Sequence, residues 1–225
     1  MIEFHKDLDT ISYNTTIWRY MPIENFIRLI NYRELHFHRI DSFNDKEEGT
    51  LTTIDKKIFR YFSNSKEYWE TERKRHYISC WIESPHELAL MWQTYGKKGI
   101  AIKSSVKSLI NSFEHDSEHK IYISKVQYLD YDKNSSQVNG TPINILKIVF
   151  TKRKFYEQEK EIRLLYSKYD SHKGQEEKWY NLNSEIELMI EEIRLAPGFT
   201  MENEMKIRNL LISNNLNIPV LKSEI

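Results

Sequence analysis

Hydrophobic and polar residues follow two patterns along the chain, one typical of strands and one typical of helices. Alternation with a period of two, or a short run rich in branched and aromatic residues, predicts strands at residues 16–20, 35–40, 76–82, 99–103, 120–130, 162–166, 178–182 and 193–197. Apolar residues three and four positions apart predict helices that begin at Pro22 and that cover much of residues 51–75, 106–113 and 144–150. This succession of elements predicts an α+β fold with a mixed, largely antiparallel sheet flanked by helices.

Three further helices have end signals in the sequence. Ser84–Glu87 has the pattern of a capping box, which predicts a helix over residues 88–95 that stops at Gly96. The strands predicted before and after this helix would then complete a strand–helix–strand unit that could be parallel. Ser184–Glu187 is a second capping box and predicts a helix that extends to Ile193. The third helix, over residues 201–213, has Thr200 as its predicted cap.

A charged segment runs directly into a strand-like one at residues 155–166. Read with a period of two, it places Glu157, Glu159, Glu161 and Arg163 on one face. Carboxylates this close together repel one another unless cations lie opposite them. The segment is either a solvated strand at a sheet edge or a site where one carboxylate is held ready for chemistry. The local pattern favours the solvated edge.

Length and composition narrow the class of protein. The 225 residues suit one domain, which we expect to cover residues 1–225. Lys plus Arg and Asp plus Glu both total 33, so no net charge attracts nucleic acid or an anionic membrane to the whole protein. Cys80 is the only cysteine, which excludes an internal disulfide. No apolar run nears the ~18 residues of a membrane span, and the N-terminus lacks the apolar region of a signal peptide. We therefore expect a cytoplasmic protein with no membrane partner.

Several blocks of the sequence resemble those of a bacterial family, and they occur in the same order. The blocks are Trp18–Pro22, Leu35–Phe37, Phe43–Asp45 with Glu48-Gly49, Ser79–Trp81, Met91–Gly96 and Glu159–Leu164. Together they are similar to the bacterial DUF2971 family, a domain of unknown function, over nearly the whole chain. Lys46 stands where this family usually has a proline, a departure that removes no reactive group. The family name itself supplies no activity.

A weaker resemblance implies an activity. An Arg-Tyr strand followed by a short helix, and a late strand that carries a glutamate, are similar to the layout of ADP-ribosyltransferases. That resemblance implies an ADP-ribosyltransferase-like fold which binds NAD as its substrate in a cleft, and a transferase that serves as a toxin or a phage-defence effector. None of the 6 glycines belongs to a GxGxxG motif or a P-loop, so side chains would have to hold the dinucleotide.

The chemistry of NAD cleavage assigns roles to particular residues. Breaking the bond between ribose and nicotinamide passes through an oxocarbenium-like state, which a facing carboxylate stabilises. We expect Glu161 to be that carboxylate and Arg163 to keep it ionised. Arg19 could present its guanidinium to the pyrophosphate. The other residues that we expect at the NAD site are Tyr20, Asn44, Trp92 and Tyr95.

Each of these residues also has a simpler structural interpretation. Arg19 could neutralise the face that carries Glu159 and Glu161. Trp92 and Tyr95 have the spacing of core residues, and Asn44 could only cap a turn. On this interpretation the protein is a binding module without chemistry.

A metal-dependent nuclease is the alternative enzyme. Asp130 or Asp132, together with Gln158–Lys160, is similar to the acid-x-lysine pattern of magnesium nucleases, although 29% charged residues produce such spacings by chance. His36 and His38 have a spacing that suits a metal, but no third ligand accompanies them. We therefore expect no metal. The acceptor is unknown, with nucleic acid and protein both compatible, and the sequence leaves the oligomeric state open.

Overall fold

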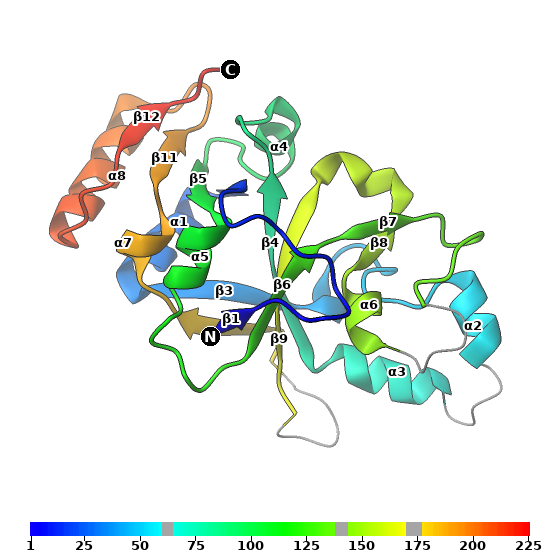
Figure 1. The fold of residues 1–225 in the computed structure, drawn as a ribbon. Coiled ribbons are helices and arrows are strands. Elements are labelled where there is room, and N and C mark those ends of the chain that lie inside the picture. Colours follow the sequence, from blue (N-terminus) through cyan, green and yellow to red (C-terminus); the bar gives the residue numbers. More distant parts are fainter. Residues whose placement is uncertain (60–64, 138–143, 170–176) are drawn as a thin grey trace.

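The structure, a computed structural model, describes residues 1–59, 65–137, 144–169 and 177–225. Within these residues a ten-stranded sheet contains most of the strands (Figure 1). Its main path runs through β1 (Ile2–Glu3), β6 (Ile121–Lys125), β9 (Glu161–Ser167), β4 (His76–Glu83), β2 (Thr16–Met21), β5 (Ile100–Ser105), β11 (Glu192–Leu195) and β12 (Val220–Lys222). A branch adds β3 (Glu34–Arg39) and β10 (Trp179–Asn183), and a separate parallel pair is formed by β7 (Gln127–Leu129) and β8 (Thr151–Arg153).

The ten-stranded sheet is mixed and largely antiparallel, as the sequence predicts. Its parallel pairs are β1 with β6 and β11 with β12. Because β2 pairs antiparallel with both β4 and β5, the strands β4 and β5 run in the same direction with β2 between them. The prediction that these two strands could be parallel is confirmed.

The sheet forks along one edge of β4. At one end of this strand Ile82 and Glu83 pair with β2, whereas at the other end Tyr77 and Ile78 pair with β3. Strand β10 then pairs with the outer side of β3. Between the two pairings, β4 has a stretch that pairs with neither β2 nor β3, and this gap is where the candidate site lies.

The helices lie on both sides of the central strands β4 and β9 (Figure 1). They are α1 (Ile23–Tyr32), α2 (Thr53–Phe59), α3 (Ser65–Arg73), α4 (Ala89–Thr94), α5 (Val106–Asn111), α6 (Ile145–Val149), α7 (Ile186–Met189) and α8 (Met201–Ser213). The described residues also form two short 3-10 helices, η1 (Ile40–Ser42) and η2 (Lys154–Glu159). The largest hydrophobic core joins α1, α5, α7 and α8 to the sheet. No helix in the described parts of the chain is long and apolar enough to cross a membrane.

Alternation along the strands separates two faces of the sheet. Tyr77 and Trp81 of β4 belong to the largest core, whereas Ile78 belongs to a smaller core that also contains Leu165. Cys80 lies on the same face as Ile78 because the two are two residues apart on one strand.

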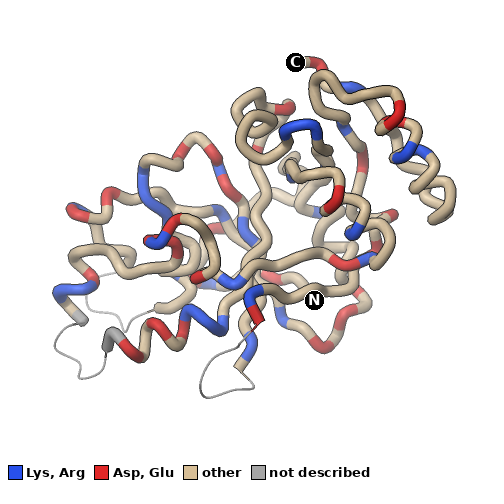
Figure 2. Tube along the Cα trace, turned by 180° about the vertical axis from the view of Figure 1, so that it is seen from behind, with Lys and Arg blue, Asp and Glu red and all other residues tan. Residues whose placement is uncertain are grey.

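Acidic and basic residues are interspersed along the chain (Figure 2), in line with the neutral net charge.

Several sequence predictions hold closely. The strands predicted at residues 16–20, 35–40, 76–82 and 178–182 correspond to β2, β3, β4 and β10. Helix α8 has the predicted bounds, and Thr200 Oγ1 caps it by accepting a hydrogen bond from the Asn203 N–H at 3.3 Å. That residues 1–225 form one domain stays a prediction.

Both predicted capping boxes are wrong. Ser84 Oγ accepts a hydrogen bond from the His86 N–H at 3.2 Å in a local turn, and helix α4 begins only at Ala89. The Glu87 carboxylate is unavailable for capping because it accepts hydrogen bonds from Trp92 Nε1 at 2.7 Å and from Ser223 Oγ at 2.6 Å. The box at residues 184–187 overlaps the four-residue helix α7 (Ile186–Met189), which has no side-chain cap and ends before Ile193.

The charged segment at residues 155–166 is also not the strand that was predicted. Residues before the strand form η2, which places Glu157 and Glu159 off the strand, and Lys160 ends the turn with a φ of 44°. Strand β9 begins at Glu161 and lies between β4 and β6, so the solvated edge favoured by the local pattern is wrong. The strand predicted over residues 120–130 is interrupted at Val126, and its two parts join different sheets.

Candidate active site

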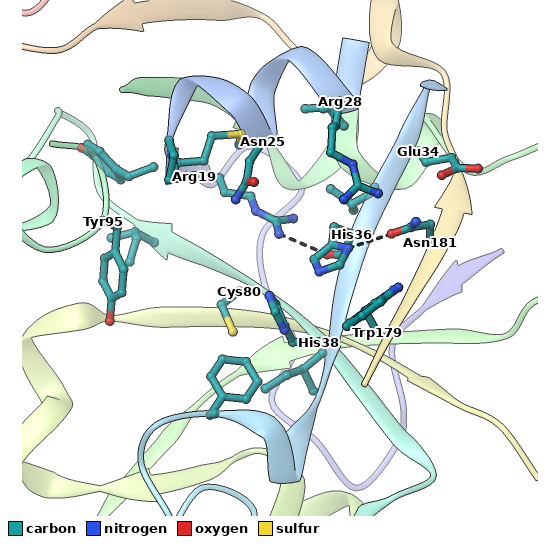
Figure 3. A pocket seen from close by; sticks show the side chains of 18 of the residues that line it. Arg19, Asn25, Arg28, Glu34, His36, His38, Cys80, Tyr95, Trp179 and Asn181 are labelled. Carbon is teal, nitrogen blue, oxygen red and sulfur yellow. Dashed lines mark hydrogen bonds between the residues drawn. The ribbon is translucent and has the colours of Figure 1, made fainter. Parts of the chain in front are cut away.

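A pocket of about 600 Å³ lies at the fork of the sheet (Figure 3). Residues of β2, α1, β3, β4, β9 and β10 line it, together with Tyr95, Lys152 and Glu159. The volume lies within the range of small-molecule sites. Strands far apart in the sequence therefore contribute to one cavity.

Strand register explains which side chains reach this pocket. On β4, Ile78, Cys80 and Ile82 share one face, and their partners on β9 are Leu165, Arg163 and Glu161. On the other branch, His36 is paired with Asn181 and His38 with Trp179. Directly paired residues project to the same side of a sheet, so both branches present polar side chains to the cavity.

Arg19 is held in the gap between the two branches of the sheet. Its Nη2 donates a hydrogen bond to the His36 carbonyl at 3.1 Å, its Nη1 donates one to Ser79 Oγ, and its guanidinium lies 5.9 Å from the Trp81 ring centre. Among the described residues, no carboxylate forms an ion pair with it. Burial lowers its pKa to about 10, so the side chain remains charged at neutral pH. This unbalanced positive charge faces the pocket.

Glu161 belongs to a group of five alternating charges, here called the charge cluster: Glu48, Lys152, Glu159, Glu161 and Arg163. Glu161 Oε1 lies 2.8 Å from Arg163 Nε, and Glu161 Oε2 lies 3.2 Å from Lys152 Nζ. Arg163 Nη2 also lies 3.0 Å from Glu48 Oε1, and Lys152 Nζ lies 2.7 Å from Glu159 Oε2. With three carboxylates and two cations, the charge cluster has one excess negative charge.

The surroundings of Glu161 keep its carboxylate ionised. Burial by itself raises the pKa of this carboxyl, but the charges of Arg163 and Lys152 outweigh burial and hold the pKa below its usual range. Burial lowers the pKa of Lys152, and Glu161 and Glu48 raise it by more, so the ammonium is also retained. The Cys80 thiol beside Glu161 has its pKa raised by burial and by this carboxylate, so it remains protonated.

Two of the predicted aromatic residues line the pocket. Tyr95 donates its hydroxyl to Glu159 Oε1 at 2.9 Å, which connects it to the charge cluster. Tyr20 packs its ring edge-on against Trp92 at 5.0 Å, and its hydroxyl accepts the Leu88 N–H at 2.8 Å. Burial raises the pKa of the Tyr20 hydroxyl to about 12, so it stays neutral.

The structure does not bring every predicted site residue to the pocket. Glu161, Arg19, Tyr20 and Tyr95 line it, whereas Arg163, Asn44 and Trp92 are outside its lining. Arg163 is fully buried behind Glu161 and can act only by positioning it. Trp92 belongs to a small hydrophobic core and is 4% exposed. Asn44 is exposed to solvent in the loop after β3.

Sequence reasoning missed several residues of the pocket. Asn25 and Arg28 are exposed polar positions of an amphipathic helix, which no local signal separates from ordinary solvated residues. Lys152 is part of a basic triplet, and Trp179 and Asn181 lie on a strand with little other chemistry. Only the pairing of distant strands brings these side chains to the cavity.

The two histidines of β3 line the pocket without forming a metal site. Their rings lie 4.5 Å apart, edge to face, and His36 Nδ1 lies 2.7 Å from Asn181 Oδ1. Burial lowers the pKa of His36, and it lowers the pKa of His38 to about 4, so both rings are neutral at pH 7. In the described part of the chain no three His, Cys, Asp or Glu side chains are grouped to hold a metal. Asp130 and Asp132 are not among the pocket residues.

Comparison with known proteins gives a family and three similar structures. No curated protein matches the sequence significantly. Three similar solved structures are of DarT from Thermus sp. 2.9. Its complex with carba-NAD+ is 10% identical, with a TM-score of 0.42, over 95% of this chain and 97% of that one. The complex with NAD+ is 11% identical (TM-score 0.43, coverage 96% and 98%), and the complex with ADP-ribosylated ssDNA is 10% identical (TM-score 0.44, coverage 96% and 97%).

The family match covers the region from α4 to α8. The sequence profile of the DUF2971 family, described as a protein of unknown function, matches residues 91–207. This stretch contains Tyr95, Lys152, Glu159 and Glu161 of the pocket, and it is more than half of the 225 residues. The chain therefore belongs to the DUF2971 family, as the blocks of its sequence predict.

Proposed function

We propose that the protein is an ADP-ribosyltransferase-like enzyme that cleaves NAD between ribose and nicotinamide and transfers ADP-ribose to an acceptor. One observation carries this proposal: a single pocket is lined by a cation without a carboxylate partner, Arg19, and by an ionised carboxylate, Glu161. NAD combines an anionic pyrophosphate with a cationic nicotinamide ring. The charges of the pocket complement both parts of this molecule.

Arg19 suits the pyrophosphate. Its guanidinium is anchored by Ser79 and by the His36 carbonyl, so it is fixed before any ligand binds. Arg28 also lines the pocket and forms no ion pair within the described residues. Guanidinium groups bind phosphate oxygens with paired hydrogen bonds, and a partly buried site strengthens that interaction. Two such groups would neutralise the two negative charges of the pyrophosphate.

Glu161 suits the reacting ribose. When the bond to nicotinamide breaks, the electron pair leaves with nicotinamide and positive charge develops on the ribose. An ionised carboxylate in a site with little water stabilises that charge strongly. Lys152 and Arg163 each contact one oxygen of Glu161, and a carboxylate has further lone pairs for a ribose hydroxyl. A nucleophilic atom of the acceptor then bonds to the ribose carbon and loses its proton.

The remaining parts of the proposal concern the biological role. The acceptor is a nucleic acid or a protein. By modifying it, the enzyme would act in the cytoplasm as a toxin or a phage-defence effector.

The mechanism needs no metal, since side chains supply both charges. A chelator should therefore leave activity unchanged, whereas loss of activity would favour a metal-dependent nuclease.

The test is substitution of Glu161 by glutamine. Glu161→Gln keeps the size and the hydrogen-bonding capacity of the side chain but removes its charge. We expect nicotinamide release from NAD to fall about a hundredfold or more, the scale of losing one electrostatic stabiliser. Release is measured on the purified protein together with its thermal unfolding midpoint, so that loss of folding is recognised.

Glu157→Gln is the matched control. Glu157 is exposed on η2 and lies outside the pocket, so its variant should release nicotinamide at the wild-type rate. Full turnover in a folded Glu161→Gln variant would contradict the role of Glu161. Absence of nicotinamide release from the wild type, with nucleic acid and protein acceptors both supplied, would contradict the proposed function itself.

A further inference from the structure

The end of the pocket away from the charge cluster has a composition of its own. Figure 3 shows Tyr95 at one end, Arg19 and Cys80 in the middle, and Trp179, Asn181 and Glu34 at the other end. The first end leads to Glu161, since Tyr95 contacts Glu159 and Cys80 lies beside Glu161. The second end lies on β3 and β10.

We propose that this second end, on β3 and β10, is a nucleobase subsite that holds the adenosine part of the substrate, with the base stacked on Trp179. This inference rests on the proposed function for the orientation of NAD, because Glu161 must face the ribose that carries nicotinamide. The subsite itself rests on the residues described next.

Trp179 supplies the stacking surface. Trp179 is 54% exposed although it lines a concave pocket, so much of its surface is open to a ligand. Strand pairing places it directly opposite His38, whose ring is neutral and packs against His36. Stacking of a base on an exposed aromatic ring is a common and sequence-tolerant mode of nucleotide binding.

Asn181 and Glu34 supply polar groups for the edge of the base. Asn181 Oδ1 accepts a hydrogen bond from His36 Nδ1 at 2.7 Å, which orients the amide and leaves its NH2 group free to donate. Glu34 lines the same end and forms no ion pair within the described residues, so its carboxylate is free to accept. On the paired strands these two residues are diagonal neighbours. A purine edge presents both donors and acceptors.

The spacing suits a dinucleotide that extends across the strands. Glu161 lies on β9 and Trp179 on β10, and the intervening strands are β4 and β3. Three strand spacings correspond to about 14 Å across the sheet, and the registers add an offset along β4 from Ile82, opposite Glu161, to Ile78, opposite His38. One ring cannot bridge this distance, whereas two nucleosides joined by a pyrophosphate can. Arg19 lies between the two ends, where the pyrophosphate would be, and Arg28 lies above His36 (Figure 3).

The first arm of the test measures binding without turnover. ADP is titrated into the wild type and into Trp179→Ala, Trp179→Phe and Tyr68→Ala by calorimetry. Loss of one stacked base should weaken ADP binding about tenfold in Trp179→Ala. Trp179→Phe keeps an aromatic face and should retain most of the affinity. Tyr68 is 56% exposed and outside the pocket, so Tyr68→Ala should bind ADP as the wild type does.

The second arm compares two substrates. Nicotinamide mononucleotide lacks the adenosine part of NAD, so Trp179→Ala should lower kcat/KM about tenfold for NAD and leave it unchanged for nicotinamide mononucleotide. If nicotinamide itself stacked on Trp179, both substrates would lose equally, and the assignment would be overturned.

The two arms separate the failure of the subsite from the failure of the proposed function. Trp179-dependent ADP binding in a protein that releases no nicotinamide would support the subsite and contradict the proposed function. NAD cleavage with ADP affinity that is unchanged in Trp179→Ala would support the function and overturn the subsite. A wild type that neither binds ADP nor cleaves NAD overturns both.

Discussion

Arg163 is a single buried residue that positions Glu161 in the candidate active site. It lies on a central strand with no exposed surface, and its guanidinium contacts Glu161, Glu48 and the Val149 carbonyl. A buried cation is tolerated only where acceptors surround it closely, so its partners are held in one geometry. Glu161 thereby keeps its orientation toward the pocket through a residue that is outside the pocket lining.

His76 provides a prediction at the same scale. This residue of β4 has no exposed surface, and burial lowers its pKa to about 4, with a further contribution from Arg75. Its Nδ1 lies 2.9 Å from Ser167 Oγ, and its Nε2 lies 4.0 Å from Glu72 Oε2. In the unfolded chain the pKa is about 6.5. Between pH 6.5 and 4 the unfolded chain therefore binds a proton that the folded protein does not.

His76 lowers the free energy of unfolding least above pH 6.5, where it is neutral in both the folded and the unfolded chain. The free energy of unfolding decreases as the pH falls from 6.5 to 4, because the unfolded chain gains a proton there and the folded protein does not. We expect about 2 kcal/mol of unfolding free energy to be lost between pH 7 and pH 5 through His76 alone. Urea unfolding at a series of pH values measures this loss. His76→Gln cannot take up a proton and should show a shallower dependence by that amount. Parallel curves for the two proteins would contradict the assignment.

At the scale of elements, the cap predicted for α8 forms, whereas the capping box predicted at residues 84–87 does not. Thr200 is free to cap α8 and does so. Glu87, in contrast, contacts Trp92, Ser223 and Glu224, all outside the turn that it was predicted to close. A capping box is a local pattern, and here tertiary partners engage the glutamate instead.

The α8 cap gives a direct test of this interpretation. Thr200→Ala removes the acceptor for the Asn203 N–H and should cost about 1 kcal/mol of unfolding free energy. Thr200→Ser keeps the hydroxyl and should lose only a few tenths. Denaturant unfolding compares the two variants with the wild type. Equal destabilisation by alanine and serine would indicate that packing of the methyl group, rather than the cap, is important.

At the scale of the whole molecule, the C-terminal strand β12 covers one edge of the sheet. It pairs with β11, and the following residues Ser223 and Glu224 contact Glu87 after β4. The pocket lies at the fork beside β4, with β5 and β11 between it and β12, and among the described residues none beyond Asn181 lines it. Stability and ligand binding should therefore be separable.

Deletion of residues 219–225 tests that separation. The deletion removes β12 and leaves β11 as an open edge, so the thermal midpoint should fall by about 5 °C or more. ADP affinity, measured below the new midpoint, should equal that of the full chain. A loss of ADP binding in the folded deletion variant would show that the C-terminal strand supports the pocket.

Local sequence determined much of this protein. Alternation, or a short run of aromatic and branched residues, specifies β2, β3, β4 and β10, because both signals depend only on residues close together in the chain. The same spacing puts Glu161 and Arg163 on one face, and their ion pair follows. The sequence was also sufficient to assign the family and the α+β class, and to select Arg19 and Glu161 as candidate site residues.

Tertiary structure alone decided which side chains meet. Glu48 and Lys152 reach Glu161 from other elements, and Trp179 reaches His38 through the pairing of β10 with β3. Such contacts depend on strand order and register, which arise from pairing over long distances in sequence. For the same reason the tertiary fold placed Trp92 in a core and Asn44 in solvent. The tertiary fold also buried β9 at the centre of the sheet. The neighbouring strands β4 and β6 form hydrogen bonds with its backbone N–H and C=O groups. The charge cluster neutralises most of the charge on its side chains, which would otherwise need water.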